Sequence, residues 1–371
     1  MVKFLDLHHQ YLSIKSEIDK AIADTISNTS FIGGSAVTEF EHAFAAYQQA
    51  AHCVGVANGT DALEIAIEAL ALPIGSEIIV PANSFISSSE AVTRSGHRVV
   101  FADIDPGTYL INPSDVKRHL GPNTRAIIAV HLYGQPCDMD SLRELANAHN
   151  LAIIEDCAQA HGAEYKGRRV GTLGDVSTFS FYPGKNLGAY GDAGAIVTND
   201  THLALRCRMI ANHGRVEKYN HIMEGRNSRL DGLQAAILSV KLRHLDKWID
   251  RRNEIAQVYL EGLAGLPDTH LPFVQTDVRH SFHLFVIRTP YRAELIKHLT
   301  EHEIETGIHY PIALPKLKAY EYLGQRDDCP NACTMDDQVL SIPMGEHLQP
   351  EHAEAVVMYI KQFNEQLLSL K

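Results

Sequence analysis

Short apolar runs and longer amphipathic stretches alternate along this 371-residue chain. The apolar runs have the length of buried strands, whereas the stretches between them, such as 141–150, have the pattern of helices. Alternation of this kind is typical of an α/β fold with a mostly parallel sheet. The expected strands cover 78–81, 99–104, 126–130, 151–154, 176–181 and 195–198.

Helical spacing near the N-terminus predicts one amphipathic helix lying on the body of the protein. Its apolar face consists of Tyr11, Ile14, Ile18, Ile22 and Ile26. A second helix is expected after the loop at Gly33 and Gly34. The apolar face of that helix consists of Val37, Phe40, Phe44 and Ala45.

The pattern changes after a long predicted helix from Leu230 to Leu245. The remainder has the features of a smaller α+β unit, and the length of the chain also favours two domains. We therefore predict a large domain over 1–246 and a small domain over 247–371. The expected elements of the small domain are a strand at 284–288, a helix at 292–302, a strand at 304–308 and a C-terminal amphipathic helix.

Two of the expected strands run directly into polar residues and glycine. One ends in Asp156, and the other continues into the turn Tyr182-Pro183-Gly184-Lys185. In α/β sheets, functional side chains gather at the carboxyl ends of strands. A lysine amine can form a Schiff base, and a nearby carboxylate can hold a protonated pyridine nitrogen. Taken singly, Lys185 could be a solvated lysine and Asp156 could be a helix N-cap, but the two together favour a catalytic role.

A third segment, Asn58-Gly59-Thr60, opens a helix that is apolar on most sides. Free N–H groups at the start of a buried helix suit an anion, and glycine lets a phosphate approach the backbone. Capping of the helix by Thr60 or Asp61 is an equally good interpretation of this segment alone.

These segments resemble the nucleotide-sugar aminotransferases, the DegT/DnrJ/StrS group. The resemblance covers nearly the whole chain and is carried by the motifs at 58–63, 155–163 and 179–188. It implies the aspartate aminotransferase-like fold, which is fold type I of the pyridoxal phosphate enzymes. That fold has a large domain with a mostly parallel mixed sheet and a smaller α+β C-terminal domain. The implied cofactor is pyridoxal 5'-phosphate, with pyridoxamine 5'-phosphate as the intermediate form.

The resemblance also implies roles for residues around the cofactor ring. Lys185 would hold the cofactor as a Schiff base and move the proton of the reacting carbon. Asp156 would pair with the ring nitrogen, Gln159 would bind the ring hydroxyl, and Phe85 would stack on the ring. Without the resemblance, Phe85 would be interpreted as a core residue.

The phosphate contacts that the resemblance implies are Gly59, Thr60, Ser180 and, from the neighbouring subunit, Asn227. A contribution of Asn227 across subunits implies a homodimer with shared active sites. From composition alone, Asn227 would be a loop or cap residue.

The implied reaction takes an amino group from L-glutamate and gives it to a nucleotide-linked keto sugar. The segment 182–192 is most similar to the branch that acts on dTDP-3-keto-6-deoxyhexoses, which would feed deoxysugar pathways such as O-antigen or lipopolysaccharide biosynthesis. The candidate contacts to the sugar and diphosphate are Tyr182, Lys218, His309 and Tyr310. The family usually has a further Pro, a His and a Gln-Pro pair where this chain has 313–318. This departure concerns how the nucleotide is bound.

Three alternatives remain open from the sequence. The first is amination at C4 of a dTDP-, UDP- or GDP-linked sugar. The second is a sugar dehydratase, but those relatives replace the Schiff-base lysine with histidine, which Lys185 disfavours. The third is a noncatalytic regulator or scaffold, and the presence of lysine, aspartate, glutamine and phosphate turn together weighs against it.

Composition excludes several other classes. The net charge of −12 argues against a general nucleic-acid or anionic-membrane surface. No apolar run is long enough to span a bilayer, and the first residues lack the apolar region of a signal peptide, so we expect a cytoplasmic protein. The six cysteines lack CxxC spacing. No metal site is expected, because the pairs His8-His9 and His280-x-x-His283 lack further ligands at metal spacing.

Overall fold

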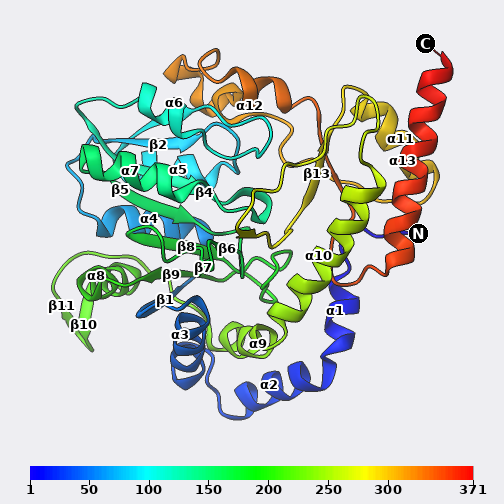
Figure 1. Ribbon diagram of the computed structural model, residues 1–371. Helices are drawn as coiled ribbons and strands as arrows, with labels where there is room; N and C mark the ends of the chain where they lie inside the picture. The colour runs from blue at the N-terminus through cyan, green and yellow to red at the C-terminus, as the bar shows by residue number, and fades with distance from the viewer. Residues whose placement is uncertain (371) are drawn as a thin grey trace.

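The computed structural model describes residues 1–370, and a seven-stranded mixed sheet lies at its centre (Figure 1). In order across the sheet, the strands are β1 (His52–Val56), β9 (Gly194–Thr198), β8 (Val176–Ser180), β5 (Ala152–Asp156), β4 (Thr124–Val130), β2 (Glu77–Pro81) and β3 (Arg98–Ala102). Neighbours from β8 to β3 pair in parallel, whereas β9 is antiparallel to both β1 and β8. The predicted α/β class with a mostly parallel sheet is therefore confirmed.

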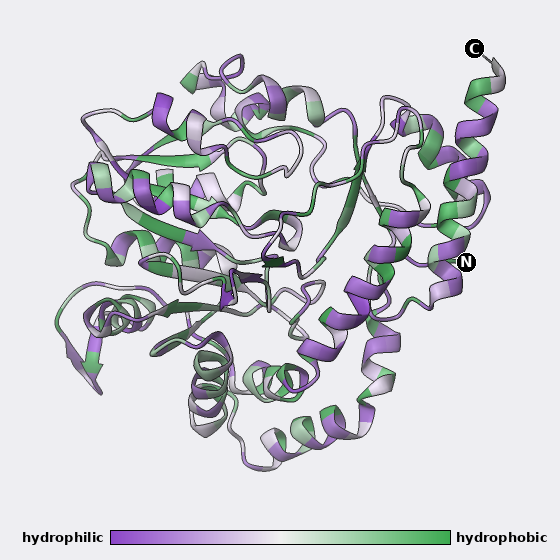
Figure 2. Ribbon diagram, viewed as in Figure 1, coloured by the Kyte–Doolittle hydropathy of each residue, from purple (hydrophilic) through white to green (hydrophobic). Residues whose placement is uncertain are grey.

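Helices lie on both sides of this sheet (Figure 1). They are α3 (Ser35–Gln48), α4 (Gly59–Ala69), α5 (Ser87–Arg94), α6 (Pro113–Arg118), α7 (Met139–His149), α8 (Thr201–Ala211) and α9 (Gly232–Leu242). Figure 2 shows hydrophobic residues concentrated in the strands, while the helices alternate between hydrophobic and hydrophilic faces. Burial on both faces explains why the strands are short apolar runs rather than alternating ones.

Several smaller elements lie outside the seven-stranded sheet. A hairpin of β10 (Arg215–Glu217) and β11 (Asn220–His221) projects from the body at the lower left of Figure 1. A second small sheet joins β6 (Glu164–Tyr165), β7 (Arg168–Arg169) and β12 (Val278–Arg279). Short helical turns are η1 (Leu132–Gly134), η2 (Leu314–Lys316), η3 (Lys318–Leu323) and α12 (Pro330–Met335).

The prediction of one continuous N-terminal helix is wrong. The chain forms α1 (Leu7–Ser13) and α2 (Lys15–Ser27), which are separated by a break at Ile14. Ile14 and Ile18 are buried, but Ile26 is 54% exposed. Residues four apart on a helix diverge by about 40° per step, so Ile26 turns away from the face that Ile14 and Ile18 bury.

The C-terminal part packs around a pair of antiparallel strands, β13 (Phe285–Arg288) and β14 (Val339–Ile342). Its helices are α10 (Leu245–Gly262), α11 (Arg292–Glu301) and α13 (Pro350–Leu370), which lie together on the right of Figure 1. The predicted strand at 304–308 is wrong, because β14 occupies the place beside β13. In the predicted segment, only Ile304 and Gly307 form isolated bridges.

Two large clusters of buried apolar side chains underlie this arrangement. One lies around the seven-stranded sheet, and the other joins α10, α11 and α13 to β13 and β14. Buried residues from 313 to 339, including Leu314 and Met335, pack on the first cluster. The division at 246/247 stays a prediction, and it falls within the first turn of α10.

Two further properties concern the described residues as a whole. Among residues 1–370, none of the helices combines the length and the apolar character needed to cross a membrane. All six cysteines are free thiols, and only Cys333 is not buried.

Aromatic packing connects the outer helix α3 to the strand that leads to Lys185. Phe44 meets Phe179 and Phe181 edge to face, with ring centroids 5.0 and 5.3 Å apart. We expect Phe44→Ala to lower the free energy of unfolding by about 3–5 kcal/mol, as truncation of a fully buried aromatic does. The measurement is equilibrium unfolding in urea.

Leu12→Ala is the matched control for this prediction, because Leu12 is 53% exposed. We expect the control to stay within about 0.5 kcal/mol of the wild type. Equal effects of the two substitutions would contradict the assignment of Phe44 to the core.

Candidate active site

A cavity of about 950 Å³ opens at the carboxyl ends of β5 and β8. Its walls include the starts of α4 and α5 and residues from the C-terminal part. The predicted site residues that line it are Gly59, Thr60, Phe85, Asp156, Gln159, Ser180, Tyr182, Lys185, His309 and Tyr310. Residues that are far apart in the sequence therefore meet in one space.

Lys185 lies on a tight turn after β8. The turn is closed by the Lys185 amide, which donates to the Tyr182 carbonyl at 2.8 Å, and the next residue, Asn186, is buried and donates to the Ser281 carbonyl at 2.9 Å. Burial lowers the pKa of the Lys185 ammonium to about 8, although the negative charge of Asp156 opposes the shift. A substantial share of the amine is therefore neutral near physiological pH, as a nucleophile requires.

Asp156 ends β5 and is 5% exposed. One carboxylate oxygen accepts a hydrogen bond from the Ser88 hydroxyl at 2.8 Å, and the other accepts from the Ala158 amide at 3.1 Å. No helix begins at Asp156 in the described chain, so the N-cap interpretation is wrong. The carboxylate has a fixed orientation and faces the same cavity as Lys185.

The start of α4 forms an anion cradle. Asn58 caps this helix by accepting from the Asp61 amide, so capping by Thr60 or Asp61 is not what the structure shows. The Thr60 hydroxyl instead pairs with the Ser87 hydroxyl at the start of α5, at 2.7 Å. A Cβ atom at Gly59 would lie 2.6 Å from the Cβ of Ser180, so any larger residue would fill the cradle.

Phe85 is 53% exposed, which overturns its interpretation as a core residue. Its ring lies 5.7 Å from the ring of Tyr310. The Tyr310 hydroxyl accepts from the Gln159 amide group at 3.0 Å, and the Gln159 carbonyl oxygen accepts from the Tyr133 backbone at 2.7 Å. Gln159 keeps one further N–H that can reach a ligand.

This set of groups fits pyridoxal phosphate. The amine of Lys185 suits the aldehyde, the Asp156 carboxylate suits a protonated ring nitrogen, and the exposed face of Phe85 suits a flat ring. The cradle around Gly59 suits the phosphate. The cofactor roles of these residues stay predictions that the geometry supports.

Two predicted residues lie elsewhere. Lys218 is in the turn of the β10–β11 hairpin, with its amine 5.2 Å from the ring of Tyr219. Asn227 is exposed and forms an isolated bridge with Asn212. Neither lines the cavity of its own chain.

The cavity also contains residues that sequence reasoning missed. His283, which was considered from the sequence as a metal ligand and rejected, lines the cavity, and its Nδ1 lies 3.2 Å from the Asn186 side-chain oxygen. Burial lowers the pKa of His283 well below its usual value, and the nearby Lys185 adds to the shift. Phe4, Leu5 and Met344 are further lining residues. The only available signal was the position of His283 just before an apolar strand.

One group of potential metal ligands occurs among the described residues: His131, Glu155 and Cys157. All three are buried, and Glu155 accepts hydrogen bonds from His131 and from the amides of Gly171, Leu173 and Gly174. These donors account for the carboxylate as a structural group.

Comparison with known proteins finds relatives that match nearly the whole chain. A sequence model of the DegT/DnrJ/EryC1/StrS aminotransferase family matches residues 12–361. The dTDP-3-amino-3,4,6-trideoxy-alpha-D-glucose transaminase of Streptomyces venezuelae is 44% identical over 99% of this chain and 97% of its own length. The dTDP-3-amino-3,6-dideoxy-alpha-D-galactopyranose transaminase of Aneurinibacillus thermoaerophilus is 45% identical over 98% of this chain and 99% of its own length.

A solved structure is similarly close. The crystal structure of S. venezuelae DesV in complex with a ketimine intermediate superposes with a TM-score of 0.95. The two sequences are 44% identical, and the match covers 98% of each chain.

The pKa of Lys185 predicts how the cofactor-free protein captures pyridoxal phosphate. Only the neutral amine reacts with the aldehyde, so the capture rate should rise with pH through a midpoint near 8. An exposed lysine would instead give a midpoint above 10. Stopped-flow absorbance across this pH range measures the rate.

Pyridoxamine phosphate is the control ligand for this experiment, because it carries the same phosphate and cannot form a Schiff base with Lys185. We expect its association rate to lack the midpoint near 8. A capture rate that rises only above pH 10 would contradict the burial effect.

Proposed function

The chain belongs to the DegT/DnrJ/EryC1/StrS aminotransferase family, whose members depend on pyridoxal phosphate, and from this premise we propose its reaction. The protein transfers the amino group of L-glutamate to a nucleotide-linked keto sugar. The favoured substrate is a dTDP-3-keto-6-deoxyhexose, which would become the dTDP-3-amino-3,6-dideoxyhexose. One observation carries the proposal: Lys185, Asp156 and the Gly59 cradle share a single cavity.

The choice of C3 and of dTDP rests on the relatives. Two transaminases that are 44% and 45% identical over nearly the whole chain have names that specify 3-amino sugars linked to dTDP. Amination at C4 remains the second candidate, because the cavity itself does not distinguish the two carbons. A dehydratase is disfavoured by Lys185, which those relatives replace with histidine.

Each residue has a defined task in this reaction. Bound pyridoxal phosphate would supply an electron sink that makes the proton on the reacting carbon removable. Lys185, whose pKa is lowered by burial so that part of the amine is neutral, would accept that proton and return it at the cofactor's C4' position. Asp156 would keep the ring nitrogen protonated, and the Ser88 hydroxyl fixes the direction of the Asp156 carboxylate.

Binding tasks fall to the other residues. Gly59, Thr60 and Ser180 would hold the phosphate, Gln159 would hold the ring hydroxyl, and Phe85 would cover one face of the ring. Tyr182, His309 and Tyr310 face the sugar. Burial lowers the pKa of His309 to about 4, with Lys185 adding to the shift, so this side chain is a neutral hydrogen-bonding group.

We also propose a homodimer with shared active sites. Asn227 and Lys218 lie outside the cavity of their own chain, and the hairpin beside them exposes large apolar side chains. These are Val216, Tyr219 and Ile222. Exposed apolar groups on a projecting hairpin suit contact with a second copy, which would bring Asn227 and Lys218 to the partner's cavity. A cytoplasmic location and a product used in O-antigen or lipopolysaccharide biosynthesis belong to the same proposal.

The reaction is tested by loading the protein with pyridoxamine phosphate and adding keto sugars separately. We expect the dTDP-3-keto-6-deoxy sugar to restore the absorbance of the pyridoxal form, and the dTDP-4-keto and UDP-keto sugars to leave it unchanged. Reaction with a 4-keto or UDP sugar alone would overturn the proposed substrate but would leave the proposed enzyme class intact. Failure of every sugar would overturn the transamination of nucleotide sugars.

Shared sites predict complementation between two inactive variants. Lys185→Ala lacks the amine, and Asn227→Ala lacks the phosphate contact given to the partner. A mixed dimer would contain one intact site out of two. After subunits of the two variants have exchanged in an equimolar mixture, about half of the dimers are mixed, so the mixture should recover about a quarter of wild-type activity. The activity of the mixture is measured after subunit exchange.

Lys185→Ala mixed with Leu12→Ala is the control for mixing itself, since Leu12 is exposed and does not line the cavity, and its activity should be the same before and after subunit exchange. Each active site would again depend on one Lys185, so we expect activity to follow the proportion of intact lysines. Native mass spectrometry of the Lys185→Ala/Asn227→Ala mixture verifies that mixed dimers form. Absence of recovered activity in a mixture that contains them would count against shared sites.

A further inference from the structure

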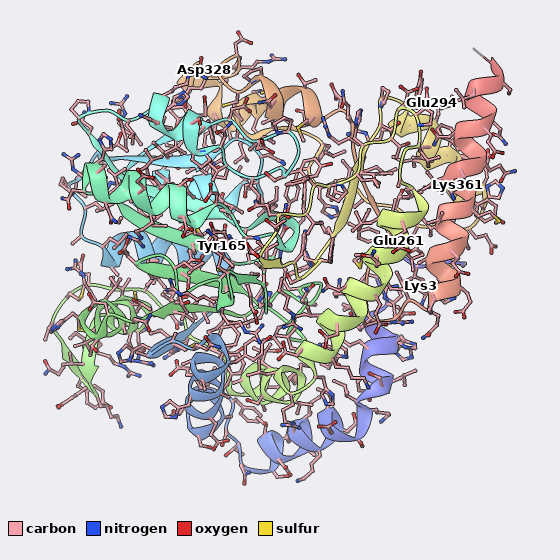
Figure 3. The ribbon with its side chains drawn as sticks, viewed as in Figure 1. Lys3, Tyr165, Glu261, Glu294, Asp328 and Lys361 are labelled. Carbon is pink, nitrogen blue, oxygen red and sulfur yellow. The ribbon has the colours of Figure 1, made fainter. Side chains whose placement is uncertain are left out.

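The first residues of the chain form a wall of the active-site cavity. We name residues 2–6 the N-terminal strap; it lies on the same side of the molecule as α10 and α13, where Lys3 is labelled in Figure 3. The strap is fixed by its backbone: Val2 bridges Ile304, and the Phe4 amide donates to the Glu305 carboxylate at 2.9 Å. Lys3 accepts a hydrogen bond at its carbonyl from His347 at 3.0 Å.

Phe4 extends a row of aromatic rings along the cavity. Its ring stacks on His309, with centroids 5.8 Å apart and planes 12° apart. The His309 ring lies 5.7 Å from Tyr310, which in turn lies 5.7 Å from Phe85. The row thus connects the strap to the side chain expected to cover the cofactor ring.

Leu5 approaches the turn that carries the reactive amine. A Cβ atom added to Gly184 would lie 3.5 Å from the Leu5 Cδ2 atom, and Gly184 immediately precedes Lys185. Both strap side chains line the cavity and are only partly buried, so they are available to a ligand.

The groups around this wall carry no unpaired positive charge among the described residues, apart from Lys185. Arg252 lines the cavity but pairs with Glu346 at 3.0 Å and donates to backbone carbonyls, including that of Met344. His283 and His309 are neutral because burial lowers the pKa of each ring. A carboxylate placed against Phe4 and Leu5 would therefore lose its water without gaining a charged partner from these groups of the same chain.

We propose that Phe4 and Leu5 determine the specificity for the sugar. They receive an uncharged, deoxygenated edge of the hexose and disfavour a hydroxymethyl or carboxylate group at that edge. This inference rests on the proposed function and adds the residues that select the sugar. Apolar pockets discriminate against an added hydroxyl by on the order of 10- to 100-fold, so the effect is measurable.

The test runs the reaction from the amino sugar, following conversion of the pyridoxal form by absorbance. The donors are a dTDP-3-amino-3,6-dideoxyhexose, its 6-hydroxy counterpart, its 6-carboxylate counterpart and L-glutamate. We expect Phe4→Ala and Leu5→Ser to raise KM for the deoxy sugar and to lower its kcat/KM about tenfold. The preference for the deoxy over the 6-hydroxy sugar should fall by a similar factor, with L-glutamate unaffected.

Two variants separate specificity from loss of structure. Phe4→Leu keeps an apolar surface and should retain most of the preference. Phe273→Ala makes the same truncation at a side chain that is 60% exposed and outside the cavity, and it should change nothing. Cofactor absorbance and melting temperature of each variant confirm an intact fold.

The outcomes are distinct. An unchanged preference in Phe4→Ala and Leu5→Ser overturns the inference, and so does an equal loss with sugar and L-glutamate, which would indicate a structural role for the strap. A wild-type protein that reacts with L-glutamate but with none of the amino sugars overturns the proposed function, and this inference falls with it.

Discussion

Removal of the Lys185 amine from water is the constraint on which the rest of the site depends. An ammonium in a crowded, poorly hydrated place loses its charge more easily, and the neutral amine is the form that reacts. The fold achieves this by placing β8 beside β5, so that Lys185 and Asp156 face one cavity. The carboxylate limits the shift but does not cancel it.

The strand that carries Asp156 serves two purposes through two successive residues. Successive side chains of a strand point to opposite faces, so Glu155 is directed away from the cavity. Burial alone would raise the pKa of the Glu155 carboxyl, but hydrogen bonds from His131 and from backbone amides outweigh it and leave the pKa lowered. Glu155 thereby fixes the loop at 171–174, which leads into β8. One strand end positions both the carboxylate of the site and the strand that bears the lysine.

Much of this could be predicted from the sequence because its signals are local. Apolar runs marked the strands of the sheet, and polar residues after two of them marked Asp156 and Lys185. The break at Ile14, the pairing of β13 with β14 and the cavity position of His283 depend on contacts between distant segments. Phe4 and Leu5 were missed for the same reason: their role follows from pairing of Val2 with Ile304, about 300 residues away in the chain.

A second buried lysine shows why a lowered pKa alone does not identify a catalytic group. Burial also lowers the pKa of Lys241 to about 8. Its amine, however, donates to the Gly188 carbonyl at 2.7 Å and lies 4.2 Å from the centre of the Tyr190 ring, and it lines no part of the cavity. Because Gly188 is three residues beyond Lys185, Lys241 holds the loop that presents the reactive amine. Burial lowers the pKa of both lysines. Only the open cavity and the facing carboxylate of Asp156 make Lys185 the reactive one.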